Sequence, residues 1–136
     1  MALRNVLFLI VCAVCFLGMM FCGESKYADA KAVTVKYLDA MENFASAVEK
    51  ASNPEALVSA VDEFEMEMKK LRPEMEAVER KYPELTDTET PPAEMEDLAH
   101  RMNTLSQRLL AVQTKLMKYA ADPDVQGALQ KLQNIK

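Results

Sequence analysis

The chain has 136 residues, a formal net charge of −5 and only three glycines. Its acidic balance argues against a nucleic-acid partner, because neutralising phosphates requires a basic face. The low glycine content, the absence of tryptophan and the abundance of helix-favouring residues predict an all-α fold.

The N-terminus has the features of a secretory signal peptide. Arg4 supplies a positive charge, residues 6–21 are almost all apolar, and Ala28-Asp29-Ala30 matches the pattern of small residues at signal-peptidase sites. We expect cleavage after Ala30 and export to the periplasm. Residues 1–30 are then the signal peptide, and residues 31–136 form a single helical domain.

Two other fates of the N-terminal segment remain open. An uncleaved segment could anchor the chain, since its apolar run is just short of the roughly 20 residues that span a membrane. The other fate is lipidation of Cys22, although bacterial lipoprotein signals carry a small residue where this chain has Phe21. We expect membrane contact only in these two cases. The remaining cysteines, Cys12 and Cys15, also lie in the apolar run, so a cleaved chain has no thiol for a disulfide or metal site.

Four amphipathic helices are predicted in the domain. Apolar residues recur at alternating spacings of three and four, which aligns them in one stripe along a helix. The second and third helices carry matching stripes and are expected to pack directly on each other as an antiparallel hairpin. The predicted fold is an antiparallel up-down-up-down four-helix bundle with long second and third helices and a short fourth helix. The predicted ranges are 33–51, 54–82, about 90–120 and 123–136.

Prolines and capping residues mark the boundaries of these helices. Asn53 and Asp122 each precede a proline, which is tolerated at the first helical position, so each predicts a capped helix start. Pro73 lies inside the second helix and predicts a kink, because it removes one backbone hydrogen bond. Residues 83–92 are polar and rich in proline, and they form the predicted linker to the third helix.

The unequal helix lengths predict an uncovered surface at one end of the bundle. We expect the first helix to end level with Pro73 and the fourth to cover only the opposite end, so that the second and third helices project as a bare tip. Methionine-rich apolar surfaces suit adaptable protein contacts. The tip is therefore the candidate surface for self-association or for an exported partner protein, and direct packing within the hairpin is the alternative. The candidate contact residues are Met75, Val78, Met95, Leu98 and Met102.

Short stretches of the chain resemble the soluble periplasmic b-type cytochromes, a family of four-helix bundles. Residues 41–44 resemble the family's stretch around its methionine haem ligand, residues 51–53 resemble its first turn, and residues 92–100 resemble the start of its third helix. The resemblance implies a haem-binding periplasmic electron carrier in which Met41 is a haem ligand.

The chain departs from that family at the second haem ligand. The family has a histidine near the end of its fourth helix, whereas residues 130–136 contain none. His100 is the only histidine, and it is expected to point away from the apolar stripe because it lies two residues from both Leu98 and Met102. A haem carrier built from this chain would need an altered ligand set.

No pattern typical of an enzyme occurs in the predicted domain. The domain lacks cysteine, its one histidine is expected to face outward, and its single glycine, Gly127, cannot form a glycine-rich phosphate loop. A di-iron bundle needs two Glu-x-x-His motifs, and residues 97–100 supply one imperfect copy. The sequence therefore predicts a non-enzymatic exported bundle without a cofactor that acts through protein contacts, with the haem carrier as the alternative.

Overall fold

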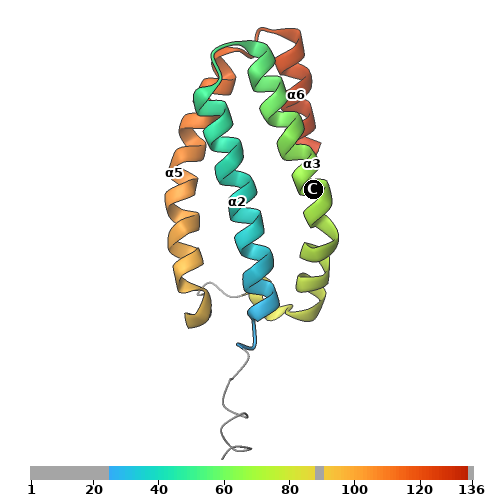
Figure 1. Ribbon diagram of the computed structural model, residues 1–136, viewed down its shortest axis with the longest axis vertical. Coiled ribbons are helices and arrows are strands. Elements are labelled where there is room, and N and C mark those ends of the chain that lie inside the picture. Colours follow the sequence, from blue (N-terminus) through green and yellow to red (C-terminus); the bar gives the residue numbers. More distant parts are fainter. Residues whose placement is uncertain (1–24, 88–90, 135–136) are drawn as a thin grey trace, which may run out of the picture.

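A computed structural model describes residues 25–87 and 91–134 of the chain (Figure 1). The described residues are almost entirely helical and contain no strand, which confirms the predicted all-α class. The short helices α4 and η2 lie in the connection between the second and third long helices. The elements are α2 (Ala28–Lys50), α3 (Pro54–Lys81), α4 (Glu84–Asp87), η2 (Ala93–Met95), α5 (Glu96–Lys118) and α6 (Pro123–Asn134).

Helix α2 lies at the centre of the bundle, between α3 and α5 (Figure 1). It runs antiparallel to α3, as the stacked rings of Phe44 and Phe64, with centroids 4.7 Å apart, and the contact between Asp29 and Lys81 indicate. It packs closely on both neighbours because its apolar face is broad. The buried residues of α2 are Ala30, Leu38, Ala40, Phe44, Ala45 and Val48.

Helices that are not consecutive in the chain pack side by side and run in the same direction. Along α2 and α5 the residue numbers of contacting residues increase together. Arg101 contacts Asp39, and Arg108, one heptad later, contacts Glu49. Helix α6 packs on α3, where Lys131 contacts Asp62 at 2.6 Å. The parallel pairs are therefore α2 with α5 and α3 with α6.

The close hairpin predicted between α3 and α5 is not the main packing contact. Each of these helices packs closely on α2 instead. Their buried stripe residues, such as Val61 on α3 and Leu105 on α5, join a shared core cluster with α2. The residue spacing predicted the apolar stripes of α3 and α5 correctly. It could not identify the helix on which these stripes pack, because the broad apolar face of α2 contacts both helices at once.

The first helix begins earlier than the sequence analysis expected. Asp29 and Ala30, which belong to the predicted cleavage pattern, lie in the first turn of α2, and Ala30 is completely buried. Helix α2 therefore reaches the end of α3, where Tyr27 packs edge-on against Tyr82 with ring centroids 5.3 Å apart. The expectation that the first helix ends level with Pro73 was wrong. Residues 1–24, with all three cysteines, lie outside the described residues.

Both predicted helix caps are present. The side-chain oxygen of Asn53 accepts a hydrogen bond from the Ala56 backbone N–H at 2.8 Å. Asp122 accepts from the backbone N–H of Val125 at 3.3 Å. Helix α3 continues through Pro73 to Lys81. None of the described helices is both long enough and apolar enough to cross a membrane.

Candidate functional site: an apolar groove between α3 and α5

An apolar groove runs between α3 and α5 at the end of the bundle where α2 begins. It consists of two adjoining cavities of about 330 and 240 Å³, which share Thr34, Val78, Glu79 and Met102 in their linings. Helix α3 forms one wall, α5 forms the other, and α2 forms the floor. Residues from three helices therefore line the groove.

The groove exists because α6 is much shorter than the helix on which it packs. At 1.5 Å per residue, the 12 residues of α6 extend about 18 Å and the 28 residues of α3 about 42 Å. Figure 1 accordingly shows α6 beside only the first part of α3. Val58 lies on the face of α3 that meets α6. Glu79 lies three heptads later on the same face, and it lines the groove. The groove thus continues the path of α6 along α3.

The structure brings together all five candidate contact residues at this groove. Met75 lines the smaller cavity, Met95 and Leu98 line the larger one, and Val78 and Met102 line both. Leu98 is 8% exposed, and the other four are half-buried. Their side chains therefore form a recessed apolar surface, and their role in binding a partner stays a prediction.

Residues of α2 and of the linker also line this groove, which the residue spacing did not predict. Val33, Thr34 and Tyr37 of α2 line it, and so do Tyr82 and Leu85 near the end of α3. The α2 residues were overlooked because the first helix was expected to end level with Pro73. The spacing of Val33 and Tyr37 on one stripe was the available signal. Burial raises the pKa of the Tyr37 phenol, which therefore stays neutral at physiological pH.

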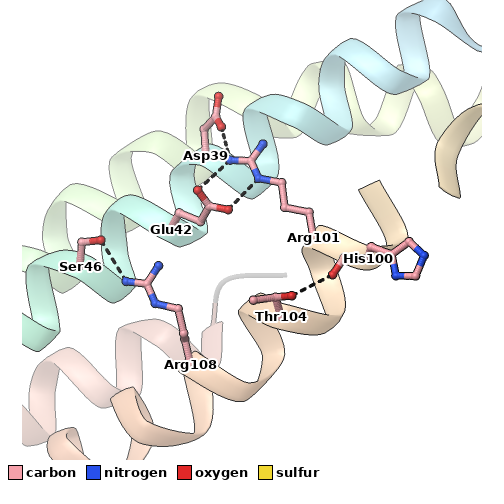
Figure 2. A network of polar contacts seen from close by, with 7 residues as sticks. All are labelled: Asp39, Glu42, Ser46, His100, Arg101, Thr104 and Arg108. Atoms are coloured by element: carbon pink, nitrogen blue, oxygen red, sulfur yellow. Dashed lines mark hydrogen bonds and ion pairs between the residues drawn. The ribbon is translucent and has the colours of Figure 1, made fainter. Parts of the chain in front are cut away.

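Two arginines of α5, one heptad apart, hold this helix against α2 (Figure 2). Arg101 donates hydrogen bonds to Glu42 at 2.6 and 2.8 Å and to Asp39 at 2.6 Å. One heptad later, Arg108 donates to Glu49 at 2.8 and 3.1 Å. These guanidinium groups lower the pKa values of the Glu42 and Glu49 carboxyls, because they stabilise the ionised forms. The contacts set the position of α5 along α2.

A second polar cluster, the N-terminal clasp, ties the start of α2 to the end of α3. Asp29 lies 2.5 Å from both the Lys81 ammonium group and the Tyr82 hydroxyl. Hydrogen bonds from Lys81, and then from Tyr82, lower the pKa of Asp29 to about 2. Beside them, Lys26 forms an ion pair with Glu84 at 2.9 Å. We define the clasp as Lys26, Tyr27 and Asp29 together with Lys81, Tyr82 and Glu84.

The residues implied by the cytochrome resemblance do not form a haem ligand pair. Met41 is partly buried against the core cluster and does not line the groove. His100 is exposed, and its ring points away from α2 (Figure 2). This orientation follows from its place beside Arg101, since consecutive helical residues point about 100° apart and Arg101 faces α2. Among the described residues, no group of three or more histidine, cysteine, aspartate and glutamate side chains could hold a metal ion.

No protein-family model matches the sequence, and comparisons with curated proteins and with solved structures found no match. The resemblance to the b-type cytochromes therefore stays a prediction from short stretches of sequence.

Proposed function

We propose that the chain is an exported, non-enzymatic helical bundle that works through protein contacts, and that its groove binds an amphipathic helix of a partner protein. One observation carries this proposal. The five residues predicted from helix spacing and unequal helix lengths lie on and beside two helices that barely touch each other, and they line two adjoining apolar cavities that form one groove. Export is proposed from the apolar residues 6–21 and the positive charge before them.

The shape of the groove favours a helix as its occupant. Because it continues the path of α6 along α3, a helix placed there would occupy the position that a longer fourth helix would fill in an up-down-up-down bundle. Helix-binding grooves in other proteins take apolar side chains at spacings of three and four residues. Flexible methionines such as Met75, Met95 and Met102 adapt readily to the side chains of such a partner.

The proposal is tested by placing charge in the groove with the double substitution Met75→Lys and Met95→Lys. The matched control is Met66→Lys with Met117→Lys, on α3 and α5, which form the walls of the groove, but at residues that are 56% and 61% exposed and outside it. Binding of the uncharged apolar dye Nile red is measured by fluorescence, and molecular mass by light scattering. We expect the groove variant to bind the dye about tenfold more weakly, because lysine in the groove must be desolvated, and the control to bind it unchanged.

Capture of exported proteins on the immobilised chain completes the comparison. A partner retained by the wild type and the control, but lost from the groove variant, would support the proposal. A wild-type mass twice that of the groove variant would identify a second copy of this chain as the occupant. Equal dye binding, mass and capture in all three proteins would rule out the groove as the contact surface.

A further inference from the structure

The N-terminal clasp includes residues that cleavage after Ala30 would remove. The Tyr82 hydroxyl lies 2.9 Å from the backbone oxygen of Lys26 and 2.5 Å from the Asp29 carboxylate, so both acceptors lie within hydrogen-bond distance of its single proton. The ring of Tyr27 covers the ring of Tyr82, which is only 6% exposed. Ahead of these residues, the Ser25 hydroxyl donates to Glu94, next to the groove residue Met95.

A chain that began at Lys31 would lose this end of the structure. Ala30 is completely buried, and Asp29 is the partner of both Lys81 and Tyr82. Without them, the Tyr82 ring would be exposed and its hydroxyl would lose both acceptors. Because Tyr82 also lines the larger cavity, the end of the groove would lose its support.

We propose that residues 25–30 are kept in the functional protein as part of its fold, so that the N-terminal segment is processed before Ser25 and not after Ala30. The two alanines of the cleavage pattern then have another role. Ala28 and Ala30 lie in the first turn of α2, where alanine has a high helix propensity, and the small side chain of Ala30 is completely buried. This inference rests on the contacts of the clasp and needs no occupant in the groove.

Retention of the clasp also constrains where Ser25 lies relative to the apolar run. Phe21 and Ser25 are four residues apart, a separation that an extended chain spans in at most about 14 Å. If the apolar run or a lipid on Cys22 is held in a bilayer, Ser25 therefore lies close to that bilayer.

The direct test is the N-terminus of the protein made from the full chain. The chain is expressed in a bacterium that exports it, the cell fractions are separated, and the intact mass is measured. We expect an N-terminus at Ser25 or before it, in whichever fraction the protein is found. A mass that begins at Lys31 would overturn the inference. The fraction reports on export separately, so failure of the proposed function and failure of this inference are distinguished.

A second measurement tests whether the clasp holds the start of α2 in place. Trypsin cleavage after Lys31 is compared with cleavage after Lys118 in the same full-length chain carrying Asp29→Asn and Tyr82→Phe. The matched control is Glu74→Gln, which removes the 2.6 Å ion pair to Lys36 between the same two helices. We expect the clasp variant to raise this ratio about tenfold through local opening, and the control to leave it unchanged. An unchanged ratio in the clasp variant would contradict a structural role for residues 25–30.

Discussion

Arg101 and Arg108 illustrate contacts that residue spacing alone does not reveal. Residue spacing reveals only local pairs, four residues apart on one helix, and Glu65 with Lys69 is such a pair at 2.7 Å. The arginine contacts instead join α5 to α2 and connect residues about sixty positions apart. Predicting them requires knowing that these helices are parallel neighbours. Because the side chains are still partly open to solvent, we expect these contacts to add only modestly to stability while they fix the position of α5.

These carboxylates make the stability of the fold sensitive to acid. The pKa values of Glu42 and Glu49 are lowered by the arginines, and that of Asp29 is lowered to about 2. The unfolded chain therefore binds protons at a higher pH than the folded chain does. The contribution of these groups is present at neutral pH and is lost as the pH falls from about 5 to about 2.

The urea midpoint of unfolding, measured at pH 7, 4.5 and 3, checks this expectation. Glu42→Gln and Glu49→Gln together should lower the midpoint at pH 7 and reduce its fall with acid. Glu76→Gln is the control, since Glu76 is exposed on α3 and its side chain makes no hydrogen bond or ion pair with any residue that the structure describes. A pH profile that is identical in the wild type and the double variant would contradict the assignment.

At the scale of elements, the sequence predicted the helices whose boundaries depend on local chemistry. Asn53 and Asp122 cap α3 and α6 where the cap-proline pattern placed those helices. The start of α2 was missed because it depends on contacts with Tyr82, more than fifty residues away in the chain. The position of the helix stripes could be predicted for the same local reason, but the choice of neighbour could not.

The cap of α3 gives a prediction at this scale. Asn53→Ala removes the acceptor for the Ala56 backbone N–H, so we expect the free energy of unfolding to fall by about 1 kcal/mol. Chemical denaturation measures this change. Asn103→Ala is the comparison, because Asn103 is exposed in the middle of α5 and alanine favours helix there. Similar losses from both substitutions would show that the capping bond adds no stability.

At the scale of the whole molecule, the sequence predicted residues of the candidate groove but not the shape of the groove. The sequence identified Met75 and Met95 as uncovered apolar residues, and both line the groove. It described a projecting tip of two helices, whereas the structure has a recess with α2 as its floor. The difference arises because the length of α2 is set by the N-terminal clasp, whose partners come from separate parts of the chain.

Titration of the purified whole chain with haem tests the haem alternative. We expect no saturable low-spin spectrum in the oxidised or the reduced state, because His100 points away from the core that contains Met41. A saturable Soret band that is lost or shifted in Met41→Ala would instead assign the protein to the electron carriers. The search would then turn to the second ligand.

The packing of non-consecutive helices has a consequence for the order in which the chain folds. Of the four long helices that the structure describes, only α2 and α3 are both consecutive and closely packed, whereas α5 docks on α2 and α6 docks on α3 across long stretches of sequence. Closing such long loops costs more entropy than forming a hairpin, so the α2–α3 hairpin should form first and the two later helices should dock on it. Substitutions between α2 and α3 should then mainly slow refolding in stopped-flow experiments, and substitutions on α5 or α6 should mainly speed unfolding. During synthesis, the hairpin would already be complete while the second half of the chain was still being made.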